Sequence, residues 1–325
     1  MRRIRTVFLG TAELACRSLS TLAASPEVEL VGVVSQPDKA RGRQLRTVPT
    51  AVKATARELG LPIWQPTRLR KDSELISHLE SLNLDVIVVA AYGQILPSSV
   101  LNIPRRGCVN VHTSLLPKYR GAAPIQWAIL NGDDTTGVTL MQMDEGMDTG
   151  PIIAQRPTPI SPTETGGELH DRLAILGAEF LAQTLPAYVT GDVIATPQDD
   201  RTATHARKLS KADAKIDWQR PAPELANQIR GLNPWPGTLS YLAQEGSSRL
   251  IKFWQSQALE STNDSDPGTI IAASPEGVDI ACGQKGTLRV IQLQREGAKR
   301  LAAGPFLSGF PLQPGDRFGS DPDQT

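Results

Sequence analysis

Three polar side chains alternate with hydrophobic ones in the stretch VNVHTS, residues 109–114. Successive side chains of a strand point to opposite faces, so Asn110, His112 and Ser114 are expected to point the same way. An amide donates hydrogen bonds to an anionic oxygen, and an imidazole donates one or moves a proton. A loop with Pro and Gly follows, as at the strand ends where open α/β sheets bind ligands.

A second polar stretch, MDEGMDTGPI at residues 143–152, follows another hydrophobic strand and places three acids among glycines. Its spacing does not match a calcium loop of the EF-hand type. An acid in a glycine turn is often there for the turn itself. The functional alternative is that Asp148 lies beside His112, because a carboxylate orients an imidazole and stabilises its charged form.

The polar set lacks a nucleophile and a metal-ligand pattern. Ser114 does not sit in G-x-S-x-G, so a serine nucleophile is weakly supported. The four histidines show no ligand spacing and the three cysteines form no CxxC pair, so we expect no metal and reduced thiols in the cytoplasm. An amide, an imidazole and a carboxylate suit group transfer between two bound substrates.

Strand-like and helix-like segments alternate from residue 4 to residue 189. Strands are expected at 4–10, 27–36, 61–65, 84–93, 108–113 and 136–143, and helices at 12–24, 50–60, 71–83, 124–131 and 167–189. This alternation predicts an α/β domain over residues 1–189 with a doubly wound, mostly parallel, Rossmann-like sheet. The first turn, GTAELA, lacks G-x-G-x-x-G and does not support a dinucleotide cofactor.

The second part of the chain has a different character. Residues 190–210 show no clear period and are interpreted as a linker. Short strand candidates then follow at 238–243, 249–258, 268–273, 277–282 and 286–294. They predict a small all-β domain over residues 211–325, closed as an OB-like barrel and ending in a frayed tail.

The charge pattern points to local contacts with a polyanion. The 325 residues carry 34 basic and 34 acidic side chains, so no global field attracts nucleic acid or membrane. Residues 37–57 nevertheless hold six Lys or Arg against one acid, and residues 201–220 hold six against two. Such segments suit a phosphate backbone. We saw no apolar stretch near the ~20 residues of a membrane span.

Several motifs resemble the 10-formyltetrahydrofolate-dependent formyltransferases. They include SLLPKYRGAAP, MDEGMDTGPI, QPDKARGR, KLSKADAKIDW and GLNPWPGT, in the order of that family's tRNA-specific branch, with coverage weakest past residue 295. The resemblance implies transfer of a formyl group from the co-substrate 10-formyltetrahydrofolate to the amine of initiator methionyl-tRNA, for translation initiation. It also implies that Asn110, His112 and Asp148 are the catalytic residues.

The resemblance assigns two binding segments as well. Ser114, Leu115, Leu116 and Pro117 match the loop that lies against the folate. Gly42 and Arg43 match a loop that contacts the tRNA acceptor stem. We also expect tRNA contacts at Arg41, Lys208 and Lys211. We expect a monomer.

Two alternatives remain open at this stage. A formyltransferase acting on a nucleotide sugar or another amine would keep the three catalytic residues but would need no basic linker. An RNA-binding protein with an inert α/β half belongs to a different class, and the intact Asn–His–Asp set argues against it.

Overall fold

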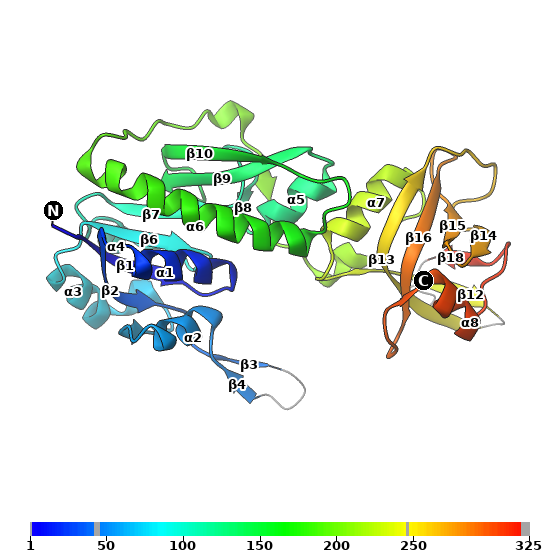
Figure 1. Cartoon of the computed structure of the whole chain (residues 1–325), viewed down its shortest axis with the longest axis horizontal. Coiled ribbons are helices and arrows are strands. Elements are labelled where there is room, and N and C mark those ends of the chain that lie inside the picture. Colours follow the sequence, from blue (N-terminus) through cyan, green and yellow to red (C-terminus); the bar gives the residue numbers. More distant parts are fainter. Residues whose placement is uncertain (1, 42–45, 245–246, 320–325) are drawn as a thin grey trace. The chain divides into compact units, whose positions relative to one another are not determined.

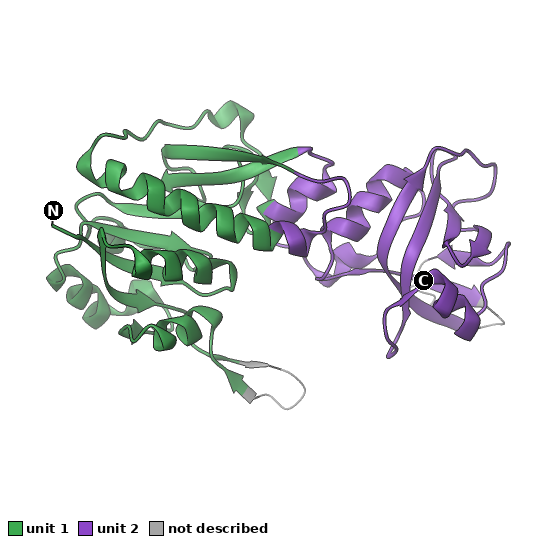
Figure 2. Ribbon diagram, viewed as in Figure 1, with its two compact units in different colours: residues 1–124, 135–159, 170–206 green, residues 125–134, 160–169, 207–325 purple. Residues whose placement is uncertain are grey.

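The computed structural model describes residues 2–41, 46–244 and 247–319. The chain divides into two units, each described by itself (Figure 2). Unit 1 contains Met1–Pro124, Thr135–Pro159 and His170–Ala206, and unit 2 contains Ile125–Asp134, Ile160–Leu169 and Arg207–Thr325. Unit 2 therefore takes two short segments from the part of the sequence before residue 170.

Unit 1 is built on a seven-stranded sheet (Figure 1). In spatial order its strands are β10 (Ile152–Pro159), β9 (Thr135–Gln142), β7 (Cys108–His112), β6 (Val86–Ala90), β1 (Ile4–Gly10), β2 (Val28–Val34) and β5 (Ile63–Trp64). The five strands from β7 to β5 pair in parallel, whereas β9 is antiparallel to both its neighbours. The predicted mostly parallel α/β sheet is confirmed.

Helices cover both faces of this sheet, as the doubly wound prediction requires. They are α1 (Leu14–Ala24), α2 (Ala51–Glu58), α3 (Ser73–Ser81), α4 (Ser98–Leu101) and α6 (Gly166–Thr190). The core of one face joins side chains of β1, β6 and β7, including Cys108, to Leu75 and Leu79 of α3 and Val100 of α4. On the other face, a Cβ at Gly177 of α6 would lie 3.0 Å from Val111 of β7.

The alternation along β7 decides what its polar residues can do. Val109 and Val111 are buried, and Val111 lies under α6. Cys108, on the opposite face, is buried in the core with α3 and α4. Asn110 and His112 continue the face of Cys108 toward the carboxyl end of the strand. The strand thus supports α6 with one face and presents an amide and an imidazole on the other.

Several elements of unit 1 differ from the sequence prediction. The edge strand β10 was not expected, because Pro157 and Pro159 argue against a strand, although an edge position tolerates proline. A hairpin of β3 (Lys39–Arg41) and β4 (Arg46–Val48) also went unpredicted. Finally, α6 is long and apolar enough by length and composition for a membrane span, contrary to our expectation, but its Leu173, Leu181 and Leu185 are buried within unit 1.

Unit 2 contains an antiparallel sheet. Its elements are α5 (Pro124–Leu130, the first residue of which belongs to unit 1), α7 (Ala222–Gly231), β12 (Thr238–Gln244), β13 (Ser247–Leu259), β14 (Ile270–Ser274), β15 (Gly277–Ala281), β16 (Thr287–Arg295), β17 (Leu301–Ala302), α8 (Ala303–Gly309) and β18 (Arg317–Gly319). The order β14-β15-β16-β13-β12-β18 forms no closed barrel among the described strands. An isolated bridge, Thr269–Arg317, links its two ends.

Two elements of unit 2 correct the expectation of an all-β domain with a frayed end. Helix α7 packs Leu225 and Ile229 into the core beside the aromatic group of Trp218, Phe253 and Phe318. Strand β18 pairs with β12 and buries Phe318, so the tail expected to fray is paired as far as Gly319. The rest of that predicted tail, residues 320–325, lies outside the described residues. The strands predicted between 238 and 294 are confirmed within three residues at each end.

Candidate active site

The carboxylate of Asp148 meets both polar side chains of β7. Asn110 Nδ2 donates to Asp148 Oδ1 at 3.4 Å, and His112 Nδ1 lies 3.7 Å from Asp148 Oδ2. The three residues predicted from the sequence to act together are thus brought together at the carboxyl end of the sheet. His112 is buried, with 6% of its side chain exposed, and Asp148 has 17% exposed.

The imidazole ring of His112 is hydrogen-bonded at Nε2 and faces the Asp148 carboxylate at Nδ1. Its Nε2 lies 3.0 Å from the carbonyl oxygen of Tyr119, which can only accept, so Nε2 carries a proton. Its Nδ1 faces the carboxylate at a distance longer than a hydrogen bond. The Nδ1 edge therefore lies beside the carboxylate without a hydrogen bond to it and is available to another partner.

The turn that carries Asp148 has an unusual backbone. Asp148 has a φ of 56°, in the left-handed region that Asp tolerates better than most residues. Its Oδ2 accepts from the backbone N–H of Gly121 at 2.8 Å. Asp144 closes the preceding turn by accepting from Gly146 N and Thr149 Oγ1 at 3.0 and 2.7 Å. Asp144 is thus committed to the turn.

The segment predicted to lie against the folate follows the end of β7. The strand stops at His112, so Ser114 does not share its face, and the Ser114 hydroxyl donates to the carbonyl of Lys118 at 2.6 Å. Ser114 and Leu116 are buried, whereas Leu115 and Pro117 are partly exposed. A ligand at this loop would meet Leu115, Pro117 and backbone atoms.

Two side chains of the neighbouring strands support that loop. Thr139 Oγ1 of β9 donates to Ser114 O and accepts from Leu116 N. Gln155 of β10 donates to Leu116 O at 2.8 Å and to Thr139 Oγ1 at 2.9 Å. Neither residue was predicted to have this role: Gln155 lies on the unpredicted strand β10, and Thr139 lies on a predicted strand but far in sequence from the loop it binds.

The predicted tRNA contacts lie apart from these side chains in the sequence. Arg41 ends β3, and Gly42 and Arg43 lie outside the described residues. Lys208 and Lys211 are exposed residues of unit 2.

The base of the β3–β4 hairpin is held by Asp38, which accepts from Gln65 at 2.8 Å and pairs with Lys53 at 2.6 Å. The hydrogen bond from Gln65, followed by that from Lys53, contributes most to lowering the pKa of Asp38. Lys53, counted with the basic segment in the sequence, is therefore neutralised by Asp38.

Another missed residue is Gln198, in the segment interpreted as a linker. Its side-chain amide donates to the carbonyls of Asp148 and Gly150 at 2.9 and 2.7 Å and accepts from Arg120. The local sequence, TPQDD, gave no signal for this role, because its partners lie about 50 and 80 positions away.

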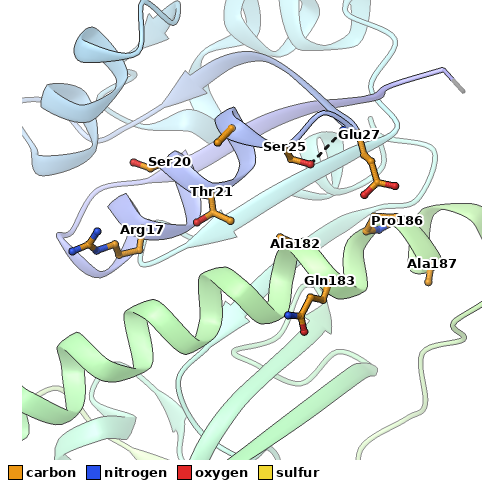
Figure 3. A pocket seen from close by; sticks show the side chains of 10 residues that line it. Arg17, Ser20, Thr21, Ser25, Glu27, Ala182, Gln183, Pro186 and Ala187 are labelled. Carbon is orange, nitrogen blue, oxygen red and sulfur yellow. Dashed lines mark hydrogen bonds between the residues drawn. The ribbon is translucent and has the colours of Figure 1, made fainter.

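A cleft elsewhere in unit 1 contains none of the predicted site residues. It has a volume of about 780 Å³ and lies between α1 and α6, lined by Arg17, Thr21, Glu27 and Gln183 among others (Figure 3). Among the described parts of the chain, no cluster of three His, Cys, Asp or Glu side chains could hold a metal ion.

Comparison with known proteins decides the family. Residues 4–185 match the family model of formyl transferases, and residues 208–311 match the model of the formyl transferase C-terminal domain. The chain belongs to the formyl transferase family. The resemblance recognised in the sequence is therefore confirmed.

Curated relatives of this formyl transferase match over nearly its whole length. The methionyl-tRNA formyltransferase of Citrifermentans bemidjiense is 46% identical over 319 residues, covering 98% of both chains. That of Marinobacter nauticus is 46% identical over 306 residues, covering 94% of this chain and 96% of its own.

Solved structures share the fold of this formyl transferase at low sequence identity. WlaRD, a sugar 3N-formyl transferase solved in the presence of dTDP and 5-N-formyl-THF, is 18% identical with a TM-score of 0.65. The match covers 92% of this chain and all of WlaRD. HypX from Aquifex aeolicus, solved with tetrahydrofolic acid, is 17% identical with a TM-score of 0.61, covering 98% of this chain and 51% of HypX.

Proposed function

We propose that this formyl transferase moves the formyl group of 10-formyltetrahydrofolate to the α-amino group of initiator methionyl-tRNA, giving N-formylmethionyl-tRNA for translation initiation. The near full-length identity to methionyl-tRNA formyltransferases supports the substrate pair. The observation that carries the site is the Asp148 carboxylate in contact with both Asn110 and His112.

The neutral amine of the methionyl ester attacks the formyl carbon, and the carbonyl oxygen becomes an oxyanion on a tetrahedral carbon. Asn110 donates a hydrogen bond to that oxyanion, and His112 in its protonated form donates another from the Nδ1 edge that faces Asp148. The C–N10 bond of the folate then breaks. The proton lost by the amine reaches N10, with Asp148 holding His112 and a relay water.

The loop Ser114, Leu115, Leu116 and Pro117 lies against the folate in this proposal, supported by Thr139 and Gln155. Contacts to the tRNA come from Arg41, Gly42 and Arg43 and from Lys208 and Lys211. The exposed Trp235, 54% accessible, is available to stack on a base.

We propose residues 1–189 as the catalytic domain, 190–210 as its connection and 211–325 as the tRNA-binding domain, an OB-like barrel. Hydrogen bonds across the ends of the unit 2 sheet support a barrel: Ile270 N to Asp316 O at 2.8 Å and Phe318 N to Gly268 O at 2.9 Å. The enzyme acts as a monomer in the cytoplasm without a membrane partner.

Formyl transfer to radiolabelled initiator methionyl-tRNA tests the proposal. Loss of one oxyanion donor typically lowers kcat by ~10²–10³, which is the result expected for Asn110→Ala. Asn102→Ala, an exposed asparagine after α4, is the matched control and should react as the parent does.

The amine acceptors separate the alternatives. Initiator methionyl-tRNA should be formylated faster than elongator methionyl-tRNA, and an amino-sugar nucleotide should not react. Equal rates for Asn110→Ala and the parent would remove the assigned site, and reaction with the sugar nucleotide alone would replace the substrate.

A further inference from the structure

The segment 196–206 links the loops of the candidate site to one another; we call it the strap. Thr196 pairs with Ile152 after the Asp148 turn, through two hydrogen bonds of 2.8 Å. Thr204 accepts from Arg120 N through its carbonyl and from Tyr119 N through its hydroxyl. The strap therefore reaches both the turn of Asp148 and the loop that carries the acceptor of His112.

Gln198 lies between these two anchor points, and its amide orientation is set by its partners. Its Oε1 accepts from Nε and Nη2 of Arg120 at 3.1 and 2.9 Å, and a guanidinium can only donate. Its Nε2 must then be the atom that faces the carbonyls of Asp148 and Gly150. One side chain thereby fixes the backbone on both sides of Thr149.

Arg120 is itself held in place. The residue is buried, with 5% exposed, and donates to the exposed carboxylate of Asp200 at 2.7 Å in addition to Gln198. Its neighbour Gly121 supplies the N–H that binds Asp148 Oδ2. Arg120 and Gln198 thus connect the two loops whose separation sets the position of the Asp148 carboxylate.

We propose that Gln198 is a positioning residue for formyl transfer that acts through Asp148. This inference rests on the proposed function of Asp148. The left-handed backbone of Asp148 persists only because surrounding contacts impose it. Without the two hydrogen bonds from Gln198, the turn relaxes and the carboxylate moves away from Asn110 and His112. A displacement of about 1 Å can cost about 10²-fold in rate.

The role depends on the donor at Nε2, and this distinguishes it from simple packing. Glutamate at position 198 keeps the size and pairs with Arg120, yet it offers no N–H to the carbonyls of Asp148 and Gly150. Gln198→Ala removes the donor and the acceptor together. If Gln198 serves only as a partner for Arg120, Gln198→Glu retains activity.

The test measures kcat and KM for both substrates in the full-length enzyme, with melting temperature and circular dichroism as measures of folding. We expect Gln198→Ala and Gln198→Glu each to lower kcat by about 10–100-fold, with both KM values changed less than about threefold. Gln183→Ala, an exposed glutamine of α6, is the matched control and should equal the parent.

Three outcomes overturn the inference: full kcat in Gln198→Glu, a loss confined to KM, or a fall in kcat no larger than the loss of folded protein explains. Asn110→Ala is measured in parallel. If Asn110→Ala is slow and the Gln198 variants are not, the positioning role fails while the site stands. If Asn110→Ala is as fast as the parent, the proposed site itself fails.

Discussion

At the scale of single residues, Asp148 is held through both its side chain and its backbone. Its side chain accepts from Gly121 N and lies against Asn110 and His112. Its backbone carbonyl accepts from Gln198. The position of the carboxylate is therefore set independently of its charge.

Asp148→Asn removes the charge of the side chain while keeping a residue that fits the turn. Asparagine also tolerates the left-handed region, so the fold and the melting temperature should change little. The rate should fall by about 10²-fold or more, because the imidazole loses the anion that holds it. Single-turnover formyl transfer checks the rate and calorimetry checks the fold. Retention of full activity would show that the carboxylate charge is not used.

The three thiols should differ in reactivity. Burial raises the pKa of Cys108 and of Cys282 to about 12, and it also raises the pKa of the less buried Cys16. Because the thiolate is the reactive form, iodoacetamide at pH 8 should label Cys16 slowly and the other two only after unfolding. Peptide mass spectrometry identifies the labelled site. Labelling of Cys108 in the native protein would contradict the buried position of β7.

The resemblance to the formyltransferases predicted Asn110, His112 and Asp148 as a group. The residue pattern alone placed Asn110 and His112 on one strand face and left Asp148 as either a turn residue or a partner of His112. It was not sufficient for Gln198 or Thr139. Their roles depend on contacts between segments far apart in the chain, which no local pattern around either residue indicates. Ser114 was placed on the strand face because the sequence does not show that β7 ends at His112.

At the scale of elements, the short parallel pair of β8 (Arg120–Gly121) and β11 (His205–Ala206) fastens the strap to the site. Gly121 has a φ of 121°, and a Cβ there would lie 2.7 Å from Ala206 O. Only glycine fits without movement of one of the two segments.

Gly121→Ala should therefore destabilise the protein by about 1–3 kcal/mol and also lower the rate. The Gly121 N–H that binds Asp148 would shift with the backbone. Urea unfolding gives the first quantity and initial rates give the second. A destabilised variant with full kcat would show that this contact does not position Asp148. Gly297→Ala is the control for the loss of a left-handed glycine, because a Cβ added at Gly297 would meet no atom within 4 Å.

The 3₁₀ turn Lys211–Ala214 carries a capping box that ends in Asp213. Hydrogen bonds from Arg207 and Ser210 lower the pKa of Asp213 well below its ordinary 3.8. A carboxyl whose pKa is lowered by folding stabilises the folded state at pH values above its pKa in the unfolded state. That contribution is lost as the pH falls toward the lower pKa of the folded state.

Asp213→Asn should lower the free energy of unfolding by about 1–2 kcal/mol between pH 7 and about pH 4. The difference should become smaller only below about pH 4. Urea midpoints across this range measure the difference, with Asp217→Asn as the control because that exposed residue only caps Gln219 N. A difference that already shrinks between pH 7 and pH 5 would contradict the direction of the pKa change.

Elements with a strong period were predictable and those defined by their partners were not. The buried run at β6 and the amphipathic α3 were placed within about three residues. Strand β10 carries prolines that only an edge position permits, and β18 is a short strand that exists because β12 offers it a partner. Helix α7 did have a signal, the spacing of Ala222, Leu225 and Ile229, which the expectation of an all-β domain obscured.

At the scale of the whole molecule, formal neutrality makes local basic segments responsible for any attraction to RNA. Binding of initiator tRNA, measured on filters, should weaken steeply between ~50 and ~200 mM salt. Lys208→Ala combined with Lys211→Ala should reduce the slope of log K against log salt by about two. Lys71→Ala, an exposed residue of unit 1, should leave it unchanged. An unaltered slope in the double variant would remove these lysines from the interface.

Unit 2 is assembled from three separate stretches of sequence. Gly231 at the end of α7 packs on Ile129 of α5, and Gly167 N donates to Asn233 O. On a ribosome adding ~5–20 residues per second, α5 emerges several seconds before α7 exists. The nascent chain must carry the buried Ile129 without its contact to Gly231 throughout that interval. A polypeptide that ends after Ala206 would never gain that contact, so the first 206 residues are expected to fold poorly on their own.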